Sequence, residues 1–259
     1  MMEPEPEQPT IGTTVDTKSW FSRLEQYGVP EFLRPYLNPI DPTTVYALSV
    51  AFFLFYLAIF VYLIQSESDE RVFSNYLMFI GASFTSVLTF LFIITANPMF
   101  ASLSSGSLIG NLLCELFVGT VYYPDQMGIY TGYVHHIVYI LLLGVGIQYI
   151  NHVAIYNITT IAELPSALIA AKRIWKIDSW NYDAFNAILF FILRVLLWVP
   201  MWGLSLFIDG ASIGEKIAFT TLSLGGGYLH LNWVIKMVEK LWTKYYFSIK
   251  MTGIPDDSE

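Results

Sequence analysis

The chain has 259 residues, of which 55% are hydrophobic and 13% charged, and its formal net charge is −8. Soluble domains carry about 25% charged residues, so half that share, together with long uncharged apolar runs, places the chain among membrane proteins. Nucleic acid as a partner would need basic patches that the sequence lacks, and the single cysteine, Cys114, excludes both an intrachain disulfide and a cysteine-rich zinc site.

The two ends of the chain are polar. Residues 1–43 are acidic and rich in proline, and we expect a disordered acidic tail followed by an interfacial amphipathic helix around residues 16–27. This stretch lacks the basic and apolar regions of a signal peptide, so membrane insertion is expected to depend on internal segments. Residues 251–259 are interpreted as an acidic C-terminal tail.

Between these ends lie seven apolar segments. A membrane-spanning helix needs about 20 mainly apolar residues, and the segments that reach or approach this length are 44–65, 76–96, 108–123, about 131–150, 153–171, 184–208 and 217 to about 241. The third is short and contains Asn111 and Glu115, and the sixth contains Arg194 and Pro200, which should kink it. We therefore predict an all-α membrane protein of about seven transmembrane helices, the first at residues 44–66.

Basic residues predict the orientation of these spans. With seven spans, one face of the membrane collects Arg71, Lys172, Arg173, Lys176, Lys240, Lys244 and Lys250. The positive-inside rule places that face in the cytosol. The N-terminus is then lumenal or extracellular, and the C-terminus is cytosolic.

Several ionisable or amide side chains share one depth inside the spans. Counted from the cytosolic ends at about 1.5 Å per residue, Glu163, Arg194 and Asn232 each lie roughly 14 Å deep, and Glu115 lies roughly 12 Å deep. A charge at the bilayer centre costs at least ~2.5 kcal/mol, so these groups should face each other or a polar cavity. We predict that Glu163 and Arg194 pair, either to hold the helices together or to line a site for a polar headgroup.

Histidines lie next to this polar layer. Folding the fourth and fifth spans together sets Tyr139 level with Glu163, and it places His135 and His136 nearer the cytosolic surface. Histidine can act as a general base or a nucleophile at neutral pH, and the alternative is a hydrogen-bonding role between helices. His152, in a loop, and His230, within a packed helix, are assigned structural roles. No HxxxH pattern or second acid reinforces a metal site, so none is predicted.

The motifs and their order resemble the TLC-domain family of membrane proteins, which includes the ceramide synthases. The resemblance covers residues 71–250 and is closest to the small TLC domain-containing proteins. It rests on His135-His136, on the sequence AELPS at residues 162–166, on Lys172-Arg173, on Asn186 with Arg194, and on LNW at residues 231–233. It implies that residues 67–250 form a six-helix barrel-like bundle around a lipid-accessible cavity, with one additional N-terminal helix. We expect the protein in the membrane of the endoplasmic reticulum.

The ceramide synthase signature is retained only in part. In those enzymes a histidine pair, a His-Asp and a further Asp are understood to serve the N-acylation of a sphingoid base by acyl-CoA. Counting from His135 without gaps, Glu163 stands where the first Asp would be, Ala162 replaces the His, and Ser166 replaces the second Asp. The resemblance therefore supplies the histidine pair and one acid, but no complete set of acid and base residues.

Three functions follow as hypotheses. The first is a membrane protein that binds or handles lipids in its bundle and serves membrane lipid homeostasis, with no cofactor and with membrane lipids as its partners. The second is an N-acyltransferase of ceramide synthase type with acyl-CoA as a substrate. The third is a non-catalytic trafficking receptor or a structural subunit with membrane-protein partners. Catalytic candidates are His135, His136 and Glu163, and candidates for lipid binding are Arg194, Asn232, Glu115 and Tyr139.

Overall fold

A computed structural model describes residues 31, 36, 40–66, 69–149, 154–200 and 212–252. The helices discussed below belong to the second of the chain's two units, Pro35–Glu259, and within the described residues all regular secondary structure is helical. The predicted interfacial helix at residues 16–27, the turn that contains His152, and most of both predicted tails lie outside the described residues.

The elements follow one another along the chain with short connections. They are α2 (Pro42–Ser66), α3 (Glu70–Thr95), α4 (Pro98–Tyr122), η2 (Pro124–Gln126), η3 (Ile129–Val134), α5 (His135–Tyr149), η4 (Ala154–Glu163), α6 (Leu164–Ile174), α7 (Trp180–Phe191), η5 (Ile192–Leu196) and α9 (Ile213–Thr252). The segments η2 and η4 are 3-10 helices, and η3 and η5 are π-helical turns. Each π-helical turn runs directly into a neighbouring α-helix.

Four helices in the described part of the chain are long and apolar enough to cross a membrane. They are Pro42–Ser66, Val72–Thr95, Pro98–Tyr122 and Trp180–Pro200, and Gly132–Gly144 is a shorter apolar helix. The predicted fifth span contains the 3-10 helix η4 followed by the short helix α6. The structure is thus an all-α membrane protein with four candidate spans, and the count of seven stays a prediction.

The third predicted span begins too late, because α4 starts at Pro98 and not at residue 108. The sequence Asn97-Pro98, which directly follows the predicted second span, begins this helix. The Asn97 side chain accepts a hydrogen bond from the Met99 N–H at 3.0 Å, and Pro98 occupies the first turn. Ala96, at φ 51°, reverses the chain between α3 and α4.

The same capping chemistry starts α2. Asp41 accepts hydrogen bonds from the Thr44 hydroxyl at 2.6 Å, from the Thr44 N–H at 2.9 Å and from the Thr43 N–H at 3.2 Å. These bonds, led by the one from the Thr44 hydroxyl, hold the pKa of the Asp41 carboxyl below its ordinary value. An N-cap aspartate followed by proline at the first helical position is a strong start signal, and it agrees with the predicted beginning of the first span.

Helix α4 lies inside the bundle and packs closely against α2. A Cβ at Gly110 would approach the Phe53 backbone nitrogen to 2.8 Å, and a Cβ at Gly106 would approach the Leu48 Cβ to 2.6 Å. This G-x-x-x-G spacing brings two helix backbones together, as small residues do inside membranes. The glycines explain why α4 is well buried although its sequence is only weakly hydrophobic.

Buried hydroxyl groups join α4 to α3 and η4. The oxygen atoms of Thr89 and Ser104 lie 2.7 Å apart, and each contacts the Thr160 hydroxyl, at 2.5 and 2.6 Å. Hydroxyl groups that satisfy one another are well suited to an environment without water. This network accounts for the serine-rich stretch at the start of α4, which a hydropathy scan does not recognise as part of a span.

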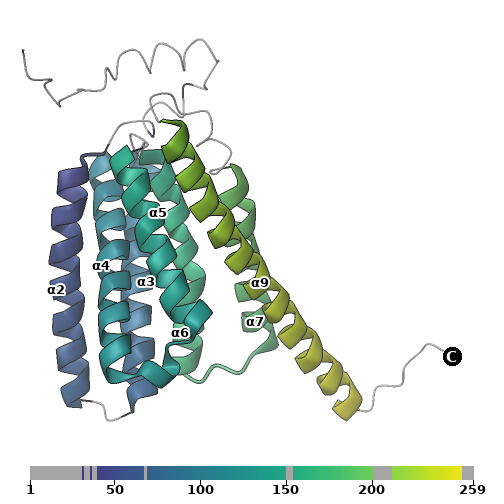
Figure 1. The fold of residues 1–259 in the computed structure, drawn as a ribbon. Helices are drawn as coiled ribbons and strands as arrows, with labels where there is room; N and C mark the ends of the chain where they lie inside the picture. The colour runs from purple at the N-terminus through teal and green to yellow at the C-terminus, as the bar shows by residue number, and fades with distance from the viewer. Residues whose placement is uncertain are drawn as a thin grey trace, which may run out of the picture. The chain divides into compact units, whose positions relative to one another are not determined.

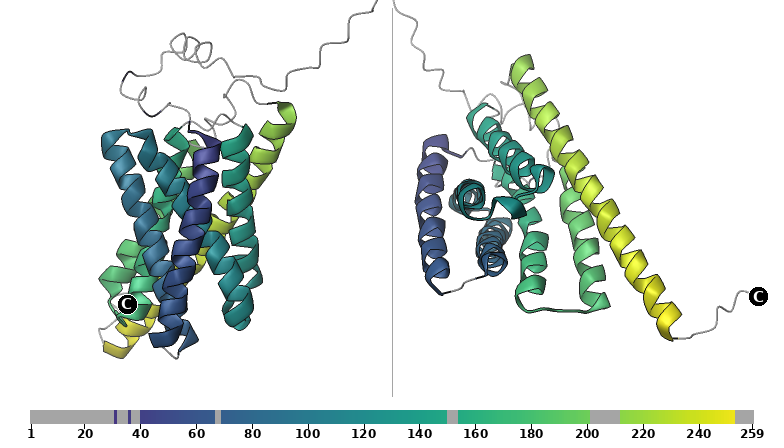
Figure 2. Two further views of the ribbon diagram at one scale, coloured as in Figure 1. Left: turned by 90° about the vertical axis from the view of Figure 1, so that its left-hand side faces the viewer. Right: turned by 60° about the horizontal axis from the view of Figure 1, so that its bottom comes forward.

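The bundle places α2 and α9 on opposite sides (Figures 1 and 2). Helix α2 packs mainly on α4, whereas α9 packs on α5 and α7. At 40 residues, α9 is roughly 60 Å long at 1.5 Å per residue, about twice the thickness of the hydrocarbon core of a bilayer. Helix α9 is therefore longer than one membrane crossing requires.

Candidate functional site

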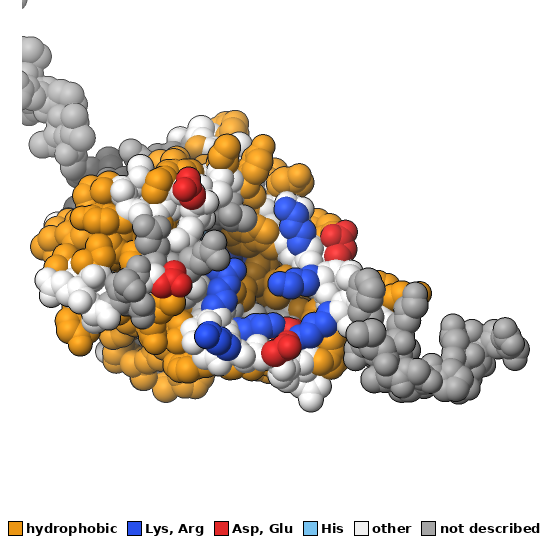
Figure 3. Space-filling model, turned by 90° about the horizontal axis from the view of Figure 1, so that it is seen from below, with side chains coloured by type: hydrophobic (Ala, Val, Ile, Leu, Met, Phe, Trp, Pro, Cys, Tyr) orange, Lys and Arg blue, Asp and Glu red, His pale blue; other side chains and the backbone are white. Residues whose placement is uncertain are grey.

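A cavity of about 520 Å³ opens between the helices. Its walls come from α3, α4, the α4–α5 connection, α5, η4 and α6, α7 and η5, and α9, and no residue of α2 contributes. On the face shown in Figure 3 the molecule is hollowed, with Lys and Arg side chains around the hollow and hydrophobic side chains within it. The cavity thus has both apolar and polar lining side chains and a basic rim.

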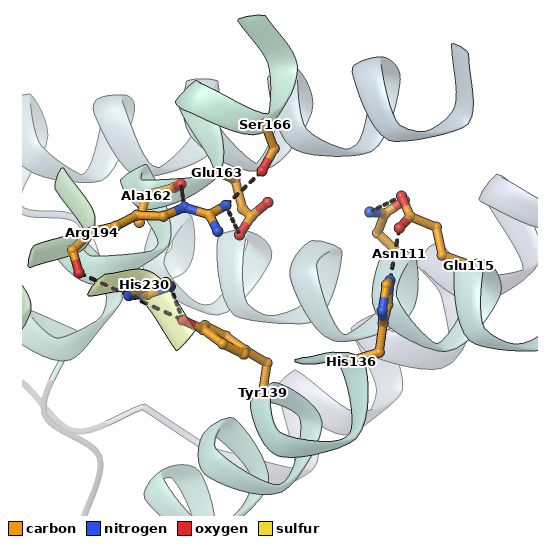
Figure 4. Close-up of polar contacts among 9 residues, drawn as sticks. All are labelled: Asn111, Glu115, His136, Tyr139, Ala162, Glu163, Ser166, Arg194 and His230. Carbon is orange, nitrogen blue, oxygen red and sulfur yellow. Dashed lines mark hydrogen bonds and ion pairs between the residues drawn. The ribbon is translucent and has the colours of Figure 1, made fainter. Parts of the chain in front are cut away.

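The guanidinium of Arg194 is held on one side of the cavity. Arg194 is only 2% exposed, its Nε donates to the Ala162 carbonyl at 2.7 Å, and its Nη2 donates to Glu163 Oε1 at 3.2 Å and to Ser166 Oγ at 2.6 Å (Figure 4). The guanidinium also lies over the Phe190 ring at 4.9 Å. The predicted pairing of Glu163 with Arg194 is confirmed, but Arg194, and not Glu163, is the centre of this cluster.

Irregular backbone makes room for these bonds. Pro165 follows η4 and has no N–H, so it cannot donate to the Ala162 carbonyl in the 3-10 pattern. That carbonyl accepts the Arg194 Nε–H instead. Arg194 itself lies in the π-helical turn η5, a type of distortion that often marks functional positions. Both irregular segments therefore meet at this one side chain.

His230 anchors the other side of Arg194 from helix α9. Its Nδ1 lies 2.8 Å from the Arg194 carbonyl, and its Nε2 contacts the Tyr139 hydroxyl (Figure 4). Because a carbonyl only accepts, Nδ1 carries the hydrogen, and a neutral Nε2 then accepts from the Tyr139 O–H. His230 is 1% exposed. Its placement inside a packed helix agrees with the structural role predicted for it.

A second pair lies across the cavity, between α5 and α4. His136 Nε2 is 2.9 Å from Glu115 Oε2, and His136 Nδ1 is 2.5 Å from the Gly132 carbonyl (Figure 4). Asn111 Nδ2 donates to Glu115 Oε1 at 3.0 Å. Since Nδ1 must donate to the carbonyl, the proton shared with Glu115 lies either on Nε2 or on the carboxyl. The pair is therefore neutral overall, and it holds one transferable proton beside the cavity.

The Asn111 side chain fits only because residue 81 is glycine. A Cβ at Gly81 would lie 2.1 Å from Asn111 Oδ1 and 2.3 Å from its Cγ. Any side chain on α3 at this point would displace the amide that supports Glu115. Asn111 was noted in the sequence only as a polar residue within the third span, and its contact with Glu115 at i, i+4 is the signal that could have identified it.

His135 differs from its neighbour because its Nδ1 is buried without a hydrogen-bond partner in the described structure. Its ring packs against Tyr139, with centroids 4.5 Å apart, and against Trp233, at 4.9 Å. His135 is 8% exposed and lines the cavity. Among the described residues, Asn111 Oδ1 is a second buried atom of the cavity lining that lacks a partner. Both atoms are enclosed by protein, and Asn111 Oδ1 faces Gly81 of α3.

The sequence-predicted residues divide into two groups. Five of them line the cavity: His135, His136, Glu163, Arg194 and Glu115. Tyr139 is buried behind this lining and binds His230.

Asn232 was predicted to bind lipid, but the structure does not place it at the cavity. It is half-buried and does not line the cavity, whereas its neighbour Trp233 does, because consecutive residues of a helix point about 100° apart. The single polar layer is also replaced by two separate clusters, one on Arg194 and one on Glu115.

Comparison of the sequence and the structure with protein-family models, with curated proteins and with solved structures finds no match. In the part of the chain that the structure describes, no group of three or more His, Cys, Asp or Glu side chains is arranged to hold a metal ion.

The two buried histidines His135 and His230 should respond oppositely to replacement by phenylalanine. We expect His230→Phe to lower the free energy of unfolding by about 1–3 kcal/mol, because the Tyr139 hydroxyl and the Arg194 carbonyl lose their partner. His135→Phe should leave the free energy unchanged or raise it, because it removes a buried nitrogen that has no partner. Unfolding by SDS titration in detergent micelles measures both, and a His135→Phe loss as large as that of His230→Phe would contradict the assignment.

Proposed function

We propose that the chain is a seven-span membrane protein of TLC type that holds an amphiphilic lipid in the cavity between its helices. The main observation is that one cavity is lined both by apolar side chains, such as Met78 and Ile169, and by buried polar side chains, such as His135 and Glu163. The polar side chains can bind the polar group of a lipid. The apolar walls suit its hydrocarbon part.

The arrangement of the helices supports this proposal. The cavity is surrounded by the segments that follow α2, while α2 itself lies outside. A ring of six helical segments with one additional N-terminal helix is the architecture that the resemblance to the TLC-domain family implies. The cavity volume of about 520 Å³ lies within the ~300–1,000 Å³ range of small-molecule sites.

Charge supports the proposed orientation in the membrane. Arg173, Lys172, Lys240 and Lys244 gather at the end of the bundle where α6 ends, and two of them share ion pairs across that end. By the positive-inside rule this end is cytosolic, which places the N-terminus in the lumen, with the endoplasmic reticulum as the proposed membrane. The cavity then opens toward the cytosol.

Catalysis is the second candidate, and His135 favours it. As a general base, the His135 imidazole would accept the proton of an attacking amine while the amine nitrogen bonds to the acyl carbon. The C–S bond of the thioester then breaks, and His135 returns the proton to the leaving CoA sulfur. Purified protein incubated with acyl-CoA and a sphingoid base should then yield an N-acyl amide that His135→Phe abolishes. Without such a product the role is lipid binding. No observation in the described structure favours the receptor or structural-subunit alternative.

Native mass spectrometry of protein purified from membranes tests the binding function. Ile169 lines the cavity, so Ile169→Trp should fill it and remove any co-purifying lipid. Ile188 is 60% exposed on the surface of α7 and lies outside the cavity, so Ile188→Trp is the matched control. We expect lipid adducts on the wild type and on Ile188→Trp only, and adducts that Ile169→Trp leaves unchanged would contradict the proposal.

A further inference from the structure

Five basic side chains near the open end of the cavity divide into two kinds. Lys172 contacts Asp183, and Lys244 contacts both Asp178 and Asp183. The hydrogen bond from Lys244 holds the pKa of Asp178 below its ordinary value and raises the pKa of Lys244. These two lysines are therefore engaged by acids of the chain itself.

Three other cations line the cavity and have no carboxylate partner in the described structure: Arg173, Lys236 and Lys240. All three are exposed, and the only contact found for Arg173 in the described residues is a hydrogen bond from its Nη1 to Asn75 Oδ1 at 3.3 Å. We call these three side chains the basic mouth. In Figure 3 blue side chains gather around the hollow on this face.

The residues of the basic mouth lie on the helix faces that line the cavity. On α9, Lys236 and Lys240 are four residues apart on the face that also carries Trp233 and Met237, and all four line the cavity. On α6, Arg173 follows Ile169 on the same face. The mouth is thus built from two cavity walls, and on α6 Arg173 lies roughly 15 Å along the helix axis from Glu163.

The charges of the cavity lining do not balance. Its acids are Glu115 and Glu163, and each is already paired, with His136 and Arg194. The mouth therefore presents three cations that nothing in the lining neutralises, in a chain whose formal net charge is −8. Such a concentration of positive charge at the entrance to an apolar cavity attracts an anionic group.

We propose that the basic mouth binds the phosphate group of the amphiphile whose apolar part occupies the cavity. This inference rests on the proposed function and names the ligand class for the same site. Phosphate can carry two charges and offers several acceptor oxygens, so it can engage a guanidinium fork and two ammonium groups at once. A single carboxylate carries only one charge and therefore neutralises fewer of these cations. The proposed cytosolic position matches the leaflet in which anionic lipids are concentrated.

Two short-chain probes that differ only in the phosphate test the proposal: dioctanoyl phosphatidic acid and dioctanoyl glycerol. We expect the full-length protein in detergent to bind the phosphate-bearing probe more tightly, and Lys236→Gln/Lys240→Gln to weaken that binding about tenfold. Binding of dioctanoyl glycerol should stay unchanged in this variant. Thermal stabilisation and native mass spectrometry give the affinities.

The control variant is Lys176→Gln/Lys244→Gln. It removes the same number of charges from the same end, but Lys176 does not line the cavity and Lys244 is already paired. It should weaken binding by less than about twofold. An equal loss in both double variants would show a general surface charge effect and would overturn the mouth assignment.

The remaining outcomes separate the two proposals. If both probes bind with equal affinity, the lipid-binding function stands and the mouth assignment falls. If neither probe binds, the proposed function itself fails. Inorganic phosphate at concentrations equal to those of the lipid probe should not displace it, and displacement would show a free anion site instead of a headgroup site.

Discussion

Arg194→Met should lower the free energy of unfolding by about 3–5 kcal/mol, because it leaves a buried carboxylate without its counter-charge. The substitution removes the ion pair with Glu163 and the hydrogen bonds to the Ala162 carbonyl and to Ser166 Oγ. Arg194→Lys should cost less, since it retains the charge but loses the planar fork that reaches three acceptors. SDS titration in micelles measures both variants.

A double-mutant cycle separates the ion pair from packing. Glu163→Leu combined with Arg194→Met should be less destabilised than the sum of the two single variants, because no uncompensated charge remains. Exposed ion pairs contribute up to about 1 kcal/mol. If Arg194→Met lowers the free energy of unfolding by less than this, the guanidinium is not held as described.

Substitutions in the pair of His136 with Glu115 should cause the second largest loss in the free energy of unfolding. The loss should differ between the two partners. His136→Leu leaves the Glu115 carboxylate with Asn111 as its remaining hydrogen-bond partner in the described structure, and we expect a loss of about 3 kcal/mol or more. Glu115→Leu leaves a histidine that can release its proton and keep its bond to the Gly132 carbonyl, so the expected loss is about 1–3 kcal/mol.

The control for this pair is Glu115→Gln. The amide has the shape of the carboxyl and can still bond both Asn111 and a neutral His136, so the loss should stay near 1 kcal/mol. Equal losses for His136→Leu and Glu115→Gln, measured by the same SDS titration, would contradict the shared-proton pair.

The Glu163–Arg194 pair was predictable because depth along a helix follows directly from residue counting. The partner of His136 was not, because hydropathy places a residue along a span but does not fix the rotation of the helix about its axis. The same limit explains why Asn232 was expected at the site and Trp233 was not. Sequence also could not show that Lys172 and Lys244 pair with Asp183, since that contact joins α6, α7 and α9.

Helix boundaries were predictable where the apolar pattern and the capping residues agreed. For α2, the capping sequence Asp41-Pro42 agrees with the apolar pattern, and the helix begins close to the predicted residue. Asn97-Pro98 was misjudged because the serine-rich start of α4 is only weakly hydrophobic, and its hydroxyl groups are satisfied by contacts with α3 and η4 that no local pattern reveals. Both irregular segments near the site carried a local signal: Pro165 for η4, and for η5 Pro200, which lies four residues after Leu196.

Photo-crosslinking tests most directly whether a lipid occupies the cavity. Wild-type protein in vesicles that contain a phosphatidic acid with a photoactivatable acyl chain would be illuminated, digested and mapped by mass spectrometry. Labels on the cavity-lining residues Met78, Ile169 and Met237 are the predicted result. Labels confined to the outer groove between α2 and α4, at residues such as Val50 and Phe117, would contradict it.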